Sequence, residues 1–277
     1  MDQFSSSKAY APVGVFDSGI GGLTVAREII NQLPNERIIY FGDTARVPYG
    51  NKSRDTIIRY SRQIIRFLES KGVKAIVIAC NTASSYALNV LRAETKLPLI
   101  GVIDPGAKVA AQTTHNGKIG VIGTEATIGS RVYNDTISSL MPNADVLAKA
   151  CPLFVPLAEE GWLDDPVTVS VATRYLSFFS ESEIDTLILG CTHYPLLRNT
   201  IQKLMGEGVS LVNPAYETAR ELKQLLKEQN LLNDGNCCEE LPMYQFYVSD
   251  AAEKFRSFAC SIMPCKIEEA RLIHIDE

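Results

Sequence analysis

The sequence predicts an α/β protein with two similar lobes, each a mostly parallel sheet flanked by helices, and an active site at their interface. Short apolar runs of β character alternate with longer helical patterns along the 277 residues, as is typical of parallel sheets covered by helices. The pattern restarts near residue 118, and Cys80 and Cys191 follow apolar runs at equivalent places in the two halves. Chance similarity between strands rich in Ile, Val and Leu is the simpler explanation, but the matched cysteines favour an internal duplication.

The first half of the pattern contains strand-like runs separated by helical ones. Ser53 is suited to cap a helix, and Gly72 is suited to end it. Apolar residues at helical spacing between them support a helix there. The expected strands are 13–16, 37–41, 75–79 and 99–103, and the other expected helices are 23–32 and one through 86–92.

The second half repeats this alternation. Residues 123–127 are interpreted as a turn, and Pro195 as the opening of a helix, where proline is tolerated. The expected strands are 118–122, 144–149, 186–190 and 209–212, with late strands at 243–248 and 267–275; the expected helices begin near 130 and 195 and span 167–179 and 215–227; residues 230–240 are the most loop-like. We therefore expect one lobe from 12–104 with 215–277, a second from 105–214, and an N-terminal extension at 1–11.

Composition limits the functional classes. Apolar residues make up 46% of the chain and charged residues 21%, which is ordinary for a globular protein with a core. The net charge of −5 gives no electrostatic reason to expect nucleic acid or an anionic membrane as partner. Neither a signal peptide nor a membrane-spanning run is recognisable. With 7 cysteines, an odd number, we expect reduced thiols and a cytoplasmic protein.

Cys80 and Cys191 are the first candidates for chemistry. Each follows an apolar run and precedes small polar residues and a helix-like segment. A thiolate reacts where a neutral thiol largely does not, so each cysteine is expected to need a lowered pKa, which a helix N-terminus would favour. A cysteine at the end of a strand can also be a small buried apolar residue. Two matched thiols, however, suit a reaction that removes a proton from one face of a carbon and returns it on the other.

Other residues near these strand ends have weaker signals. His193 could exchange a proton with Cys191 or bind a carboxylate, and a purely structural role is equally compatible with its position. No paired Cys-x-x-Cys motif accompanies the cysteines, so we expect no metal. The glycine-rich turn after Asp17 is neither a dinucleotide fingerprint nor a P-loop, and an acidic residue there suits an amino group or a helix cap. Glu159 and Glu160 are candidate acids beside an apolar run, or simply solvated side chains.

Taken together, these segments resemble the aspartate/glutamate racemase family, and glutamate racemase within it. The resemblance covers at least residues 12–250 and is carried by several motifs in order. They are GVFDSGIGG at 14–22, YFGDTARVPYG at 40–50, ACNTA at 79–83, EAT at 125–127, VPLAE at 155–159 and LGCTHYP at 189–195.

The resemblance implies a cofactor-independent enzyme that interconverts L- and D-glutamate and supplies D-glutamate for peptidoglycan. It implies that Cys80 and Cys191 are the two acid/base thiols, Cys80 acting on the D-enantiomer and Cys191 on the L-enantiomer, assisted by Asp17, Glu159 and His193. The substrate contacts that it implies are Asp17, Ser18, Tyr49, Gly50, Asn81, Thr82, Thr192 and His193. A homodimer and activation by a cell-wall precursor are compatible with it.

Four other hypotheses about the function are compatible with the sequence. The nearest is a racemase acting on aspartate or a hydantoin. A non-catalytic amino-acid-binding module would bind glutamate without exchanging its Cα hydrogen. A pyridoxal-dependent enzyme would carry a visible chromophore, and a cysteine hydrolase would need one thiol only.

Overall fold

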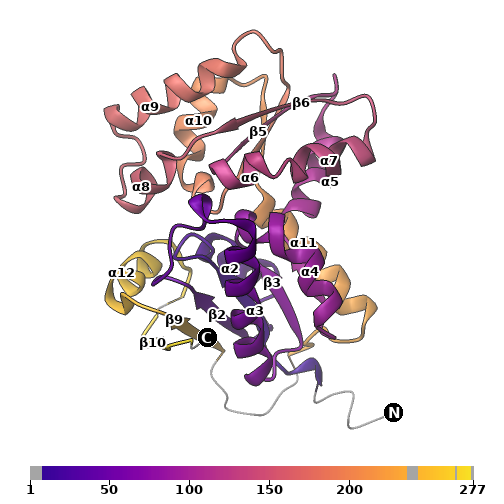
Figure 1. Ribbon diagram of the computed structural model, residues 1–277, viewed down its shortest axis with the longest axis vertical. Coiled ribbons are helices and arrows are strands. Elements are labelled where there is room, and N and C mark those ends of the chain that lie inside the picture. Colours follow the sequence, from indigo (N-terminus) through magenta and orange to yellow (C-terminus); the bar gives the residue numbers. More distant parts are fainter. Residues whose placement is uncertain (1–7, 236–242, 266, 276–277) are drawn as a thin grey trace.

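Two parallel sheets form the framework, one in each of two lobes stacked along the long axis of the molecule (Figure 1). The computed structural model describes residues 8–235, 243–265 and 267–275. The strands are β1 (Val13–Asp17), β2 (Ile38–Gly42), β3 (Ala75–Ile78), β4 (Leu99–Gly101), β5 (Lys118–Gly123), β6 (Asp145–Ala150), β7 (Thr186–Gly190), β8 (Ser210–Val212), β9 (Tyr244–Val248) and β10 (Ala270–Leu272).

Helices cover these sheets and connect their strands. They are α2 (Leu23–Gln32), α3 (Arg54–Ser70), α4 (Asn81–Glu94), α5 (Ile103–Thr113), α6 (Glu125–Gly129), α7 (Val132–Leu140), α8 (Phe154–Glu159), α9 (Pro166–Leu176), α10 (Arg198–Met205), α11 (Pro214–Glu228) and α12 (Ala252–Ile262), with short 3-10 helices η1 (Tyr49–Asn51), η2 (Ser177–Phe179) and η3 (Tyr194–Leu197). Ser53 caps α3 as expected, its side chain accepting from the Thr56 amide. In the described part of the chain, no helix has the length and apolar character required to traverse a bilayer.

The two lobes share one strand order. The first sheet runs β10-β9-β2-β1-β3-β4 and the second runs β6-β5-β7-β8, and the strands of the described residues pair in parallel. In each lobe the second strand lies on one side of the first, and the third and fourth lie on the other. The expected α/β class with two parallel sheets is confirmed.

The register of the strands places their carboxyl ends at one edge of each sheet. Asp17 pairs with Gly42, and Phe16 pairs with Ile78, so β1, β2 and β3 end side by side. In the second lobe Gly123 pairs with both Ala150 and Gly190. In open parallel sheets ligands bind outside this edge, where the chain turns in opposite directions after neighbouring strands.

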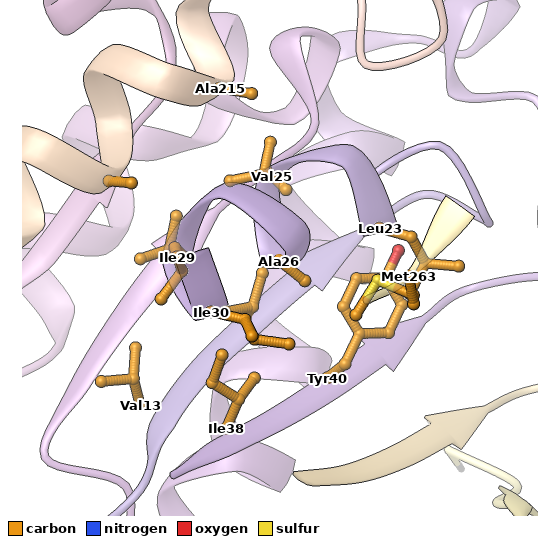
Figure 2. Packing of buried hydrophobic residues seen from close by; sticks show 14 of the residues in the cluster. Val13, Leu23, Val25, Ala26, Ile29, Ile30, Ile38, Tyr40, Ala215 and Met263 are labelled. Carbon is orange, nitrogen blue, oxygen red and sulfur yellow. The ribbon is translucent and has the colours of Figure 1, made fainter. Parts of the chain in front are cut away.

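The core of the first lobe forms because α2 presents one apolar face to the sheet. Figure 2 shows Ile30 facing Ile38 and Val25 facing Ala215 of α11. Each fully buried Leu or Ile contributes about 1.5–3 kcal/mol relative to an exposed one. This packing fixes α2, and with it the glycine-rich turn that precedes it.

Two adjacent helices carry the chain between the lobes. α5 leads into the second lobe, where Ile103 and Ala107 are buried with Ile188 of β7. α11 leads back and packs against both α2 and α5. Gly106 permits this approach, since a Cβ there would lie 3.0 Å from Cγ of Pro214.

Several expected elements differ from the structure. The turn expected at 123–127 is instead the start of a helix, α6 (Glu125–Gly129), because the Thr124 side chain caps this helix by accepting from the Thr127 amide. The strand expected at 99–103 ends at Gly101, and Ile103 already begins α5. The late strand expected at 267–275 is confined to Ala270–Leu272. The helices α5, α8 and α12 were not expected at all.

Some expectations concern residues outside the described ranges. Residues 1–7 of the N-terminal extension and residues 236–240 of the loop-like stretch lie outside them, as do Cys237 and Cys238. Of the other cysteines, Cys80, Cys151, Cys191, Cys260 and Cys265 are free thiols.

Candidate active site

A cavity of about 460 Å³ lies between the two lobes at the carboxyl ends of their strands. Residues that follow β1 and β3 line it from the first lobe, and residues that follow β5 and β7 line it from the second. It therefore meets both points at which the strand order changes direction. The residues that line it are Ser18, Gly19, Val47, Pro48, Tyr49, Gly50, Asn51, Cys80, Asn81, Thr82, Thr124, Glu125, Pro152, Val155, Pro156, Glu159, Cys191, Thr192 and His193.

Cys80 lies two residues after β3 and caps α4. Its Sγ accepts from the Ala83 amide at 3.4 Å and donates to the Ser18 hydroxyl at 3.6 Å. Burial raises the pKa of the Cys80 thiol to about 12, and the negative charge of Asp17 adds to this effect. The two hydrogen bonds lower the pKa but do not offset burial. The pKa of Cys80 is therefore raised, where the sequence led us to expect a lowered one.

Cys191 is part of a chain of three polar side chains. Its Sγ lies 3.8 Å from Nδ1 of His193, whose Nε2 lies 3.2 Å from Oε1 of Glu159. Burial lowers the pKa of His193, but its hydrogen bonds to Cys191 and Glu159 outweigh this and raise it to about 10. The hydrogen bond from His193 lowers the pKa of Glu159. The result is an imidazolium held between a carboxylate and a sulfur.

The structure distinguishes the two neighbouring acids that the sequence left open. Glu159 is half-buried at the end of α8 and lines the cavity. Glu160 is exposed and does not belong to the lining. The carboxylate in contact with His193 is therefore that of Glu159.

Asp17 lies beneath the cavity and does not line it. Its Oδ2 accepts from the Gly19 amide at 3.0 Å, within the turn that leads to α2. Burial raises the pKa of Asp17, and the charge of His193 opposes that rise. Gly22 allows the turn to pass close to this carboxyl group, because a Cβ there would lie 2.4 Å from Cβ of Asp17. Asp17 can act on the cavity through its charge, without contact to its contents.

The remaining expected contact residues do line the cavity. They are Ser18, Tyr49, Gly50, Asn81, Thr82, Thr192 and His193. The Tyr49 hydroxyl donates to Asp43, away from the cavity, so this residue offers its ring and backbone. Amide, hydroxyl and backbone groups therefore make up most of the polar lining.

Sequence reasoning missed two hydroxyl groups on the second lobe. Thr124 Oγ1 lies 2.9 Å from Thr82 Oγ1, and Thr127 Oγ1 lies 3.1 Å from the same atom. Thr124 follows β5 as Ser18 follows β1, so the internal repeat was a signal that could have identified it. These hydroxyls connect the lobes beside Asn81.

The charges around the cavity are limited. In the lining given above, Glu125, Glu159 and His193 are the residues with ordinary acid or base side chains, and neither Lys nor Arg is among them. Within residues 8–235, 243–265 and 267–275, no three His, Cys, Asp or Glu side chains are grouped to hold a metal ion. The polar groups present can exchange protons and bind carboxylates by hydrogen bonds.

Comparison with known proteins decides the family. Residues 13–222 match the model of the family described as Asp/Glu/Hydantoin racemase. The chain belongs to this racemase family. The glutamate racemase of Geobacter metallireducens is 51% identical over 88% of this chain and 89% of its own. The expected enzyme class, an amino-acid racemase, is confirmed.

Solved structures of other racemases have the same fold. Glutamate racemase from Francisella tularensis, in complex with D-glutamate, has a TM-score of 0.89 at 41% identity, covering 97% of this chain and 99% of its own. The Escherichia coli enzyme, in complex with L-glutamate and the activator UDP-MurNAc-ala, has a TM-score of 0.80 at 28% identity, covering 95% and 98%. The two-lobed arrangement of this racemase is thus shared along nearly the whole chain.

Proposed function

We propose that this racemase interconverts L- and D-glutamate without a cofactor, by proton transfer between substrate Cα and two thiols, Cys80 and Cys191. The observation that carries the proposal is the placement of these thiols. Each follows the third strand of its lobe, and both line one cavity from opposite lobes. A substrate held between them would present one face of Cα to each sulfur.

The lining suits a substrate with two carboxylates. Since no Lys or Arg belongs to it, carboxylates would be bound by hydroxyl and amide groups of Ser18, Asn81, Thr82 and Thr124 and by the backbone near Gly50. Preorganised donors of this kind stabilise charge that develops during a reaction in a site shielded from water. Removal of a proton from Cα places charge beside an existing carboxylate, so this stabilisation is the main requirement of the reaction.

The proton balance requires one sulfur to be charged and the other neutral. One thiolate takes the Cα proton, the carbanion receives a proton from the opposite thiol, and the two sulfurs exchange states. The neutral Cys80 thiol fits the donor in the direction that starts from L-glutamate. The imidazolium of His193, 3.8 Å from Cys191, would stabilise the thiolate that takes the proton.

Isotope uptake tests the proposal. Purified protein in heavy water should incorporate deuterium at Cα of L-glutamate while optical activity is lost. Cys80→Ala and Cys191→Ala should each lower kcat/KM in both directions by at least about 10²–10⁴-fold, the usual contribution of a general acid or base. Cys260→Ala, which changes an exposed thiol, is the matched control.

The alternative functions predict different outcomes of these experiments. Binding of glutamate without deuterium uptake would support an amino-acid-binding module. If aspartate or a hydantoin were racemised faster than glutamate, that compound would be the substrate instead. Near-normal turnover of either cysteine variant would exclude the two-thiol scheme.

The cellular role is part of the same proposal. D-Glutamate made in the cytoplasm would serve peptidoglycan synthesis, and a cell-wall precursor would be a candidate activator, as UDP-MurNAc-ala is for the Escherichia coli enzyme. We also propose how the chain is organised. One lobe would comprise residues 12–104 with 215–277, the other 105–214, and residues 1–11 would be an N-terminal extension. The protein would form a homodimer. Mass measurement in solution with and without glutamate tests the dimer.

A further inference from the structure

We propose that Lys254 is a positioning residue, which joins the two lobes beside the cavity and orients Glu159 toward His193. This inference rests on the proposed function, since it concerns the side chains around Cys191. It assigns a role to α12, which contributes no residue to the cavity lining.

The two oxygens of the Glu159 carboxylate contact different lobes. Oε1 lies 3.2 Å from Nε2 of His193 in the second lobe. Oε2 lies 3.4 Å from Nζ of Lys254 in the first lobe. An ammonium on one oxygen restricts rotation of the carboxylate and leaves the other oxygen directed at the imidazole.

These side chains lead from solvent to the reacting sulfur. The side chain of Lys254 is 62% exposed, that of Glu159 26%, and that of His193 9%. Lys254 therefore acts at the outer end of the chain, and Cys191 lies at the inner end. An added positive charge also helps Glu159 remain a carboxylate, since the charge of Lys254 lowers its pKa after the larger effects of His193 and burial.

The ion pair between Lys254 and Glu159 links the two lobes. Figure 1 shows α8 of the second lobe and α12 of the first on the same side of the molecule, and the Lys254–Glu159 pair joins them. Near the other end of the cavity the lobes are held by buried neutral hydrogen bonds, such as that from Tyr133 to Asn81. An exposed ion pair is weaker and more sensitive to salt than such bonds, so it suits a contact that can open.

Lys254 does not serve to stabilise α12 itself. The residue lies in the first turn of the helix, where a positive charge opposes the helix dipole. Arg256, by contrast, pairs with Glu253 one turn away on the same helix at 2.9 Å. Arg256 thus provides a matched control that removes a positive charge from α12 without a contact to the second lobe.

The test compares Lys254→Gln with Arg256→Gln and Lys254→Arg. Lys254→Gln should lower kcat about threefold to fivefold, the range that an exposed ion pair can supply, with KM changed less than twofold. Lys254→Arg should restore kcat, and Arg256→Gln should leave it unchanged. In a Glu159→Gln background, Lys254→Gln should have no further effect, because its partner has lost its charge.

A second measurement does not depend on turnover. Amide hydrogen exchange of residues 154–159 should be about threefold faster in Lys254→Gln than in Arg256→Gln, although the substitution lies in the other lobe. An inactive wild type would refute the proposed function, and the exchange rates would still decide whether Lys254 holds α8. Equal kcat and equal exchange in the two variants, with an active wild type, would overturn the inference.

Discussion

The two matched thiols have different surroundings. Cys80 accepts from the Ala83 amide and donates to the Ser18 hydroxyl, and burial outweighs the effect of both hydrogen bonds, so the pKa of this thiol is raised. Cys191 has an imidazolium beside it. Equivalent positions in a repeated fold therefore have different electrostatic surroundings.

The charge of His193 predicts a pH dependence of stability. Its pKa is raised from 6.5 in an unfolded chain to about 10 in the folded one, so folding favours the protonated form. This stabilisation is complete below about pH 6.5 and is lost as the pH rises through about 10. Between pH 7 and 10 the wild type should lose on the order of 1–3 kcal/mol more free energy of unfolding than His193→Gln.

Urea unfolding at each pH measures this difference. His115→Gln is the control, because His115 is exposed and away from the cavity. The interpretation of His193 as a buried cation fails if His193→Gln and the wild type have parallel pH profiles.

At the scale of elements, the turn between β1 and α2 packs closely against residues of the second lobe. A Cβ on Gly21 would lie 2.4 Å from Oγ1 of Thr192 and 2.5 Å from Cε1 of His193. Glycine is therefore required by the approach of the two lobes, and the packing of α2 in Figure 2 prevents the turn from moving away.

Gly21→Ala should displace His193 and lower kcat/KM about tenfold to a hundredfold, because small misplacements of reacting groups have large effects on rate. The free energy of unfolding should fall by about 1–3 kcal/mol from overpacking. Gly208→Ala is the control, since nothing lies within 4 Å of a Cβ there. Equal activity of the two variants would show that the turn can adjust.

The sequence predicted best the buried parallel strands, which occur at equivalent places in the two halves of the chain. Buried parallel strands such as β3 and β7 are continuous apolar runs, and they end at one edge of a sheet, so Cys80 and Cys191 could be placed at the cavity. α5 was missed because Pro105 and Gly106 are typical of a turn. In the fold, Gly106 instead allows contact with α11, whose position depends on tertiary structure.

At the scale of the whole molecule, the contacts between lobes were beyond sequence reasoning. Lys254 and Glu159 are separated by 95 residues, and neither has a local pattern that points to the other. The Tyr133 hydroxyl donates to Asn81 Oδ1 at 2.7 Å, and Tyr86 donates to the Ala126 carbonyl at 3.0 Å. Such pairs join residues that are far apart in the sequence. The sequence could therefore place the residues at the strand ends near one cavity, but it could not predict the contacts that orient them.

The buried bond between Tyr133 and Asn81 therefore predicts coupling between stability and activity. Tyr133→Phe leaves Oδ1 of Asn81 without its donor in a buried position, which should lower the free energy of unfolding by about 1–3 kcal/mol. Because Asn81 also lines the cavity, kcat/KM should fall about tenfold as its side chain reorients. Tyr175→Phe makes the same change within the second lobe alone, where the hydroxyl accepts from the Leu153 amide, and should leave kcat/KM near the wild-type value. Calorimetry and steady-state kinetics on both variants check this, and a loss of stability in Tyr133→Phe with full activity would separate the lobe contact from the site.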